Sequence, residues 1–162
     1  DYAMDQLIDL LKTDALMPRE EMAKLLGKSR AEVDAAIASL EADGVILGYQ
    51  AVVNREKHDN GNVTAVIEIK VTPERDGGFD RVASRIARFD EVQSCYLMSG
   101  GYDLLIVVEA PTLRAAAGFV SERLSTIEGV TATATHFRLK TYKENGTFHH
   151  LEAASERLAV SP

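Results

Sequence analysis

The chain has 162 residues, of which 46% are hydrophobic and 27% charged, so it can form one ordinary domain or two small ones. No apolar run reaches the roughly 18 residues that span a bilayer and no secretory leader opens the chain, which predicts a cytoplasmic protein with no membrane partner. The formal net charge of -7 argues against tight nonspecific binding to nucleic acid, because residues 1–54 carry five Lys or Arg against ten Asp or Glu.

Apolar residues in the first part of the chain recur with helical spacing. The first predicted helix contains four of them, namely Met4, Leu7, Ile8 and Leu11. A second helix is predicted over 18–27, where a proline begins the segment and a glycine ends it. Ser29 is suited to cap a third helix, because Glu32 follows three residues later as in a capping box, and Gly44 marks the end of that helix.

Three short helices with a glycine turn between the second and third are typical of a helix-turn-helix, whose third helix enters the major groove of DNA. The candidate DNA-contact residues lie around the start of this helix and in the segment behind it: Lys28, Ser29, Arg30, Ala31, Asp34 and Tyr49. The alternative is a plain three-helix packing unit, since a recognition helix ordinarily carries more Lys or Arg.

The domain boundaries are predicted from changes in composition and period. Residues 45–53 are expected to form a strand or wing, which completes a winged helix-turn-helix domain over 1–54. The polar segment 55–62 is a connector that ends in turn-forming residues. Beyond it the hydrophobic period changes from about 3.6 to 2, which places a second domain at 63–143 and a tail at 144–162.

The second domain is predicted to contain four strands and two helices in the order βαββαβ. The predicted strands are 63–71, 92–98, 104–109 and 131–141, and the predicted helices are 79–89 and 111–129. This order is that of a ferredoxin-like fold, in which two helices cover one face of a four-stranded antiparallel sheet. The chain as a whole is therefore predicted to be an α+β protein.

A ferredoxin-like sheet leaves its second face uncovered. Apolar residues are expected there, among them Val66, Leu105, Val107, Ala132 and Ala134. Such an area is too large to leave comfortably in water, and pairing with another copy of the chain would bury it. The sequence therefore predicts a homodimer through the open face of the sheet.

A polar turn precedes the most continuous apolar run of the chain. It consists of Ser99, Gly100, Gly101, Tyr102, Asp103 and Leu104. Two glycines allow a small ligand to reach bare backbone amides, and Asp103 would accept from an ammonium group. The alternative is an ordinary hairpin corner, in which Asp103 hydrogen-bonds its own backbone.

Residues 4–143 resemble the Lrp/AsnC transcription regulators, also called feast/famine regulatory proteins. The resemblance rests on the helix-turn-helix, the segment 40–49 (LEADGVILGY), the short connector, and a ferredoxin-like domain with the turn 99–104. It implies a regulator that binds double-stranded DNA, assembles homodimers into higher oligomers, commonly octamers, and binds an amino acid between protomers. It also implies that the turn holds this effector, with Thr133 and Thr135 of a neighbouring subunit completing the site.

The third helix departs from the family pattern because alanines stand where basic residues are usual. Two explanations follow: many weak DNA-binding units act together along one DNA, or the protein is an effector-binding oligomer with weak or lost DNA binding. A third alternative is a sirohaem-decarboxylase-like enzyme on the same fold, which would use His136 and Arg138. No nucleophile–base pair or phosphate-binding loop is present, so no catalytic residue and no cofactor is predicted.

The tail is predicted to form a turn at 144–146 and a short helix that packs across a neighbouring subunit. The apolar residues of this helix are Leu151, Ala154 and Leu158. His149 and His150 are adjacent, so their side chains diverge and no metal site is predicted. The single cysteine, Cys95, lies in a predicted strand and is expected to pack in the core.

Overall fold

The computed structural model describes residues 1–149 of the chain. Two compact units are formed, residues 1–52 and the residues from 53 onward. The predicted tail helix and His150 lie outside the described residues.

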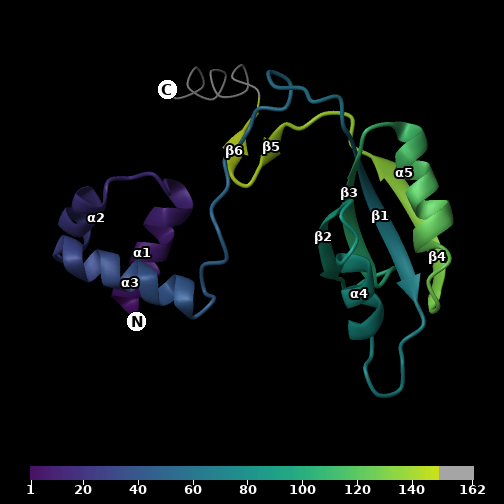
Figure 1. Ribbon diagram of the computed structural model, residues 1–162, viewed down its shortest axis with the longest axis horizontal. Coiled ribbons are helices and arrows are strands. Elements are labelled where there is room, and N and C mark those ends of the chain that lie inside the picture. The colour runs from purple at the N-terminus through teal and green to yellow at the C-terminus, as the bar shows by residue number, and fades with distance from the viewer. Residues whose placement is uncertain (150–162) are drawn as a thin grey trace, which may run out of the picture. The chain divides into compact units, whose positions relative to one another are not determined.

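The first unit consists of three helices, α1 (Tyr2–Thr13), α2 (Arg19–Leu26) and α3 (Arg30–Ala42) (Figure 1). Each helix contributes apolar side chains to one small core. The buried residues are Leu7, Met22, Ala23, Val33, Ile37 and Leu40. The predicted helical spacing is therefore confirmed.

The turn between α2 and α3 is short because each helix has its own end signal. Gly27 takes a left-handed conformation with φ 64°, which a side chain would disfavour, and ends α2. The N–H of Glu32 donates to the hydroxyl of Ser29 at 3.1 Å, so Ser29 is the N-cap of α3. These two caps fix where the exposed first turn of α3 begins.

The expected strand or wing over 45–53 is wrong, because the structure has no strand in this segment. The N–H groups of Val45 and Ile46 both donate to the carbonyl of Leu40, at 2.9 and 3.1 Å, and so close the end of α3. A strand needs a hydrogen-bonding partner, and no described segment of the chain pairs with these residues. Several apolar side chains here are exposed, including Leu47.

The second unit is a four-stranded antiparallel sheet with two helices. Its elements are β1 (Val63–Val71), α4 (Asp80–Ala87), β2 (Val92–Leu97), β3 (Leu104–Ala110), α5 (Leu113–Phe119), which continues as the π-helical turn η1 (Val120–Leu124), and β4 (Val130–Phe137). The strand order is β2-β3-β1-β4, as in a ferredoxin-like fold. The predicted fold class is confirmed. A short hairpin follows, formed by β5 (Lys143–Glu144) and β6 (Thr147–Phe148).

The strand β4 is shorter than predicted. It ends at Phe137, which pairs with Ala65, and the next backbone bond runs from the N–H of Arg138 to the carbonyl of Thr64 at 2.9 Å. Because β1 begins at Val63, residues beyond Leu139 have no strand to pair with. The alternating pattern that predicted a strand as far as residue 141 therefore extends beyond the last residue that β1 can pair with.

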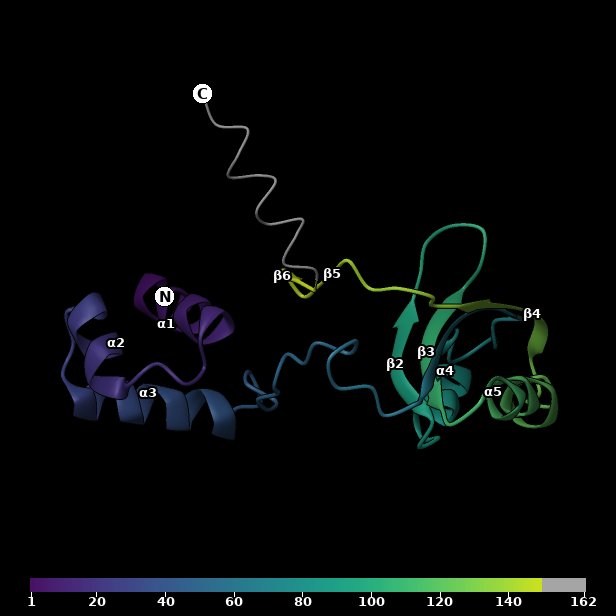
Figure 2. The ribbon, with the colours of Figure 1, turned by 90° about the horizontal axis from the view of Figure 1, so that it is seen from above.

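One face of the sheet and the two helices enclose the main core. Figure 2 shows α4 and α5 on the same side of the sheet. Alternate residues of β1 are fully buried against them, and Phe89 and Phe119 meet edge to face at 5.4 Å between ring centroids. The core residues of the sheet are Ala65, Ile67, Ile69, Val71, Leu104, Ile106, Val108 and Ala110.

The opposite face of the sheet is covered by neither of the two helices of this unit, α4 and α5. On it, Val66 lies opposite Val107 and Glu68 lies opposite Leu105. Tyr96 of β2, also opposite Leu105, adds a half-exposed aromatic ring. We call Val66, Tyr96, Leu105 and Val107 the open-face patch; Ala132 and Ala134 of β4 lie beside it, exposed.

A pair of leucine substitutions tests the core. Leu124→Ala is expected to reduce the free energy of unfolding by about 2–5 kcal/mol, because Leu124 is fully buried and a cavity would remain. Leu113→Ala removes the same atoms from a side chain that is 57% exposed, so its cost should stay below about 1 kcal/mol. Urea unfolding followed by circular dichroism measures both, and equal costs would contradict the described packing.

Candidate functional site

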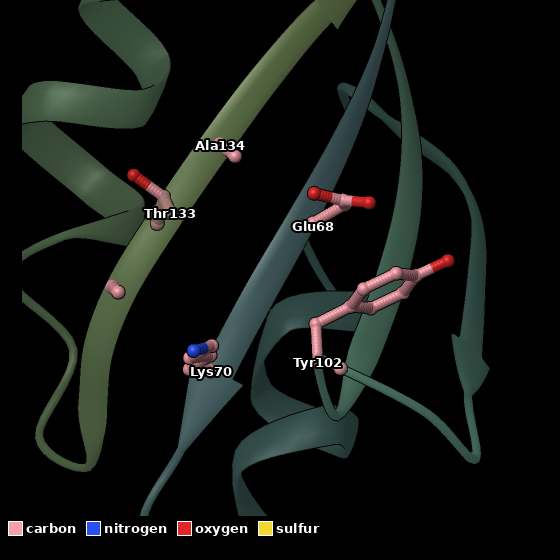
Figure 3. Close-up of a pocket in the computed structure, with 7 residues that line it drawn as sticks. Glu68, Lys70, Tyr102, Thr133 and Ala134 are labelled. Atoms are coloured by element: carbon pink, nitrogen blue, oxygen red, sulfur yellow. The ribbon is translucent and has the colours of Figure 1, made fainter.

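A pocket of about 400 Å³ lies on the open face of the sheet, near the end of β1. It is formed by β1, the turn between β2 and β3, and β4 (Figure 3). The lining residues are Glu68, Lys70, Gly101, Tyr102, Ala132, Thr133 and Ala134. Its volume is in the range typical of small-molecule sites.

The turn that borders the pocket is closed by one hydrogen bond, from the N–H of Met98 to the carbonyl of Asp103 at 2.8 Å. Gly100 has φ 150°, a conformation that disfavours a side chain. A Cβ at Gly101 would meet nothing within 4 Å, so the backbone there is open to a ligand. Within the described chain, the hydrogen bonds of the turn leave the N–H groups of Gly100 and Gly101 unused.

Asp103 holds the turn against the end of β1. Its Oδ2 accepts from the N–H of Val71 at 2.8 Å, and its own N–H donates to the carbonyl of Ile69 at 3.0 Å. The carboxylate thus satisfies a backbone group of β1, 32 residues away. The hairpin-corner alternative expected a bond to the backbone of the turn itself, so the structural role is of the expected kind but its partner lies on another strand. Asp103 is not among the residues that line the pocket.

The structure brings some of the predicted effector residues together and separates others. Gly101, Tyr102 and Thr133 line the pocket, whereas Ser99 and Gly100 belong to the same turn without lining it. Leu104 is fully buried in the core.

The two threonines of β4 point to the other face of the sheet. Thr133 lies opposite Ile69 and Thr135 opposite Ile67, and both isoleucines are buried under the helices. Residues directly opposite in a sheet share a face, so Thr133 borders the pocket while its hydroxyl turns away, as Figure 3 shows. Thr135 does not line the pocket.

Four pocket residues were missed by sequence reasoning, namely Glu68, Lys70, Ala132 and Ala134. Their signal was the polar phase of the alternation in β1 and the small residues in the matching phase of β4. Glu68 Oε2 lies 3.4 Å from His136 Nε2. Lys70 forms no ion pair with any described residue.

Five of the six candidate DNA-contact residues form one surface at the start of α3. Four of them are exposed, namely Lys28, Ser29, Arg30 and Ala31, and the fifth, Asp34, is half-buried. Tyr49 lies beside a later part of α3, where its hydroxyl donates to Glu41 at 3.4 Å. Glu41 is eleven residues along α3 from Arg30, which corresponds to about 16 Å. Desolvation, and secondarily the Glu41 carboxylate, raise the pKa of Tyr49, although the charge of Arg19 still acts to lower its pKa.

The arginines of this surface are paired with acidic side chains. Arg30 contacts Glu20 of α2 at 2.6 Å and Asp34 at 3.8 Å, and Arg19 contacts the other oxygen of Asp34 at 2.8 Å. These exposed pairs stabilise the fold weakly, by about 0–1 kcal/mol each. The acidic partners nevertheless neutralise the positive charges of Arg19 and Arg30, which would otherwise be available to a DNA phosphate.

The residues proposed for an enzyme are engaged in other contacts. His136 pairs with Glu68, and Arg138 donates to Glu144 at 3.1 Å and to the Thr64 hydroxyl at 3.2 Å. Within residues 1–149, no group of three His, Cys, Asp or Glu side chains is placed to hold a metal ion. Cys95 packs against the core, where burial raises the pKa of its thiol. No helix among the described residues is long and apolar enough to cross a membrane.

The chain thus combines a helix-turn-helix, a motif that can enter the major groove of DNA, with a domain that has a pocket of the size of small-molecule sites. Residues 64–148 match the family model of the Lrp/AsnC ligand binding domain. The chain is 42% identical over 158 residues to an uncharacterized HTH-type transcriptional regulator, YugG of Bacillus subtilis, covering 97% of this chain and 95% of that protein. The chain therefore belongs to the Lrp/AsnC family of transcriptional regulators, and not to a class of enzymes.

More distant relatives agree with this assignment. The leucine-responsive regulatory protein of Klebsiella pneumoniae is 26% identical over 139 residues, which cover 86% of this chain and 84% of that protein. Two solved structures share the fold: the L-Met complex of a transcriptional regulator from Neisseria meningitidis and the AsnC protein of E. coli. Each superposes with a TM-score of 0.68 and covers 89% of this chain. The Neisseria protein is 22% identical and is covered to 92% of its length, and the E. coli protein is 21% identical and is covered to 95%.

Proposed function

We propose that this regulator binds double-stranded DNA with α3, binds an amino acid in the pocket on the open face, and works in the cytoplasm. The main support is that Gly101 and Tyr102 of the predicted turn line one pocket of about 400 Å³ together with Thr133. This pocket lies in the domain that matches the ligand-binding family. The Klebsiella protein is named for its response to leucine and the Neisseria structure is a complex with L-Met, which favours the same class of ligand.

The proposed assembly is a homodimer through the open-face patch, with dimers joining into an octamer. A second copy would bury the apolar side chains of β1, β2 and β3 that neither α4 nor α5 covers. The pocket opens on this same face. An amino acid that binds one assembly state better than another would therefore shift self-association.

Self-association in turn sets the strength of DNA binding. Each unit presents few unpaired cations, so we propose that several units on one DNA act together through their effective concentration. The second candidate is an effector-binding assembly that no longer binds DNA. It is favoured by one observation, the pairing of Arg19 and Arg30 with Asp34 and Glu20.

A gel-shift titration separates the two candidates. The full chain is titrated at low salt against the DNA upstream of its own gene, with and without a mixture of the twenty amino acids, and against unrelated DNA of equal length as a control. We expect stepwise complexes on the upstream DNA whose distribution changes with amino acids. No complex under any of these conditions would remove DNA binding from the proposal and leave the second candidate.

A further inference from the structure

We infer that Glu68 receives the ammonium group of the amino acid and Lys70 its carboxylate. This assignment rests on the proposed function and adds two residues outside the turn 99–104. Both side chains come from β1 and line the pocket (Figure 3). One residue separates them, so the alternation of the strand places them on the same face of the sheet.

The acidic residue of the turn is already committed to the fold. Asp103 Oδ2 accepts from the N–H of Val71 at 2.8 Å, and both backbone polar groups of Asp103 are hydrogen-bonded as well. Turning this carboxylate toward a ligand would leave a strand-end N–H without its acceptor, which is costly where water is excluded. Glu68 is thus the better acceptor for an ammonium group.

The two charges of the pocket lack strong partners in the described chain. Glu68 has a 3.4 Å contact with His136, which carries a charge only when protonated. Lys70 is exposed and joins none of the ion pairs found in residues 1–149. If a second copy covers this face, both charges lose water, and a bound zwitterion would compensate each of them.

The spacing of the two side chains fits an amino acid head group. Residues two apart on a strand are separated by about 6.6 Å along it. A bridging amino acid needs two charge-assisted hydrogen bonds of about 2.8 Å each, plus the short step from its amino nitrogen to its carboxylate. Flexible Glu and Lys side chains can close such a bridge without moving the sheet.

The remaining walls select the side chain of the ligand. Tyr102 offers a ring, and Ala132 and Ala134 offer only methyl groups, which leave room beside the charged pair. These walls contain no further charge. The structure thus points to an amino acid with an apolar side chain and with its ammonium and carboxylate groups both free.

Calorimetric titration of the full chain tests this assignment. The twenty amino acids are titrated first, and the tightest is compared with its des-amino acid, in which a hydrogen replaces the ammonium group. Glu68→Gln should weaken binding of the amino acid by about 10- to 100-fold, the effect of one hydrogen bond to a charged group. It should leave binding of the des-amino acid unchanged, since that ligand cannot use the carboxylate.

Two matched variants complete the test. Lys70→Gln should weaken binding to a similar extent, and Asp103→Asn, whose amide oxygen can still accept from Val71, should stay within about threefold of wild type. Melting curves without ligand confirm that the variants are folded. This assignment would be overturned if Glu68→Gln bound the amino acid with wild-type affinity, or if Asp103→Asn lost as much affinity as is expected of Glu68→Gln. Either result would leave the proposed function intact. No binding of any amino acid to the wild type would overturn the amino acid half of the proposed function and this assignment with it.

Discussion

An Arg30→Ala variant is expected to lose the specific DNA complex at low salt, with affinity falling by about 10- to 100-fold for each helix-turn-helix unit engaged. Arg30 is the first residue of α3 and its only Lys or Arg, whereas Glu32, Asp34 and Glu41 give the helix three acidic side chains. Removing the one cation leaves a negative helix facing phosphate. Losses multiply when several units bind one DNA, so the complex should disappear from a gel at micromolar protein.

Two comparison variants make this result specific. Lys12→Ala removes a positive charge from the last turn of α1, a different helix, and should change affinity by less than about threefold. Glu20→Gln removes the 2.6 Å partner of Arg30 and should tighten binding, because the guanidinium becomes available to phosphate. Fluorescence anisotropy over a salt series measures all three. Equal losses for Arg30→Ala and Lys12→Ala would mean that α3 does not face the DNA.

The helices and the sheet were predictable because their signals are local. Ser29 and Glu32, three residues apart, predict the start of α3. The structure shows the expected hydrogen bond from the N–H of Glu32 to the Ser29 hydroxyl. The alternation of 63–71, which only Val66 interrupts, predicts a half-buried strand, and that strand lies at the centre of the core. Patterns of this kind need no knowledge of distant segments.

The errors arose where a distant partner decides the outcome. Residues 45–53 have strand-like composition, yet a strand forms only beside another, and the described chain offers none. The strand ending at Phe137 was overextended because its partner begins at Val63. In both cases the sequence has a local preference for strand, but it does not show whether another strand lies alongside to pair with it.

The candidate site was only partly predictable for a related reason. The glycines of the turn pointed to a segment that borders the pocket, because their conformations are a local property. The role of Asp103 depends on which strand end lies beside it, and that end, Val71, is 32 residues away. From the sequence alone, Glu68 and Lys70 look like ordinary solvent-facing residues of an alternating strand; only the fold shows that they line one pocket together with β4 and the turn.

A Val107→Asp variant is expected to dissociate the proposed homodimer, with the dissociation constant rising by at least about 100-fold. Val107 lies in the middle of the open-face patch, opposite Val66 and beside Ser94. An aspartate is too short to carry its charge out of a covered interface, and an uncompensated buried charge costs about 3–5 kcal/mol. A two-fold interface contains the substitution twice, so the penalty is counted twice.

Sedimentation velocity over a range of concentrations measures this effect. The matched control is Ser84→Asp, which adds the same charge to the exposed side of α4 and should leave the dimer intact. Circular dichroism melting shows whether the Val107→Asp monomer keeps its fold, as expected for a side chain that the core does not contain. If wild type sediments as a monomer at every concentration, the open face is not an interface. A dimer that survives Val107→Asp would place the interface elsewhere, and the pocket would then bind its ligand without reporting on assembly.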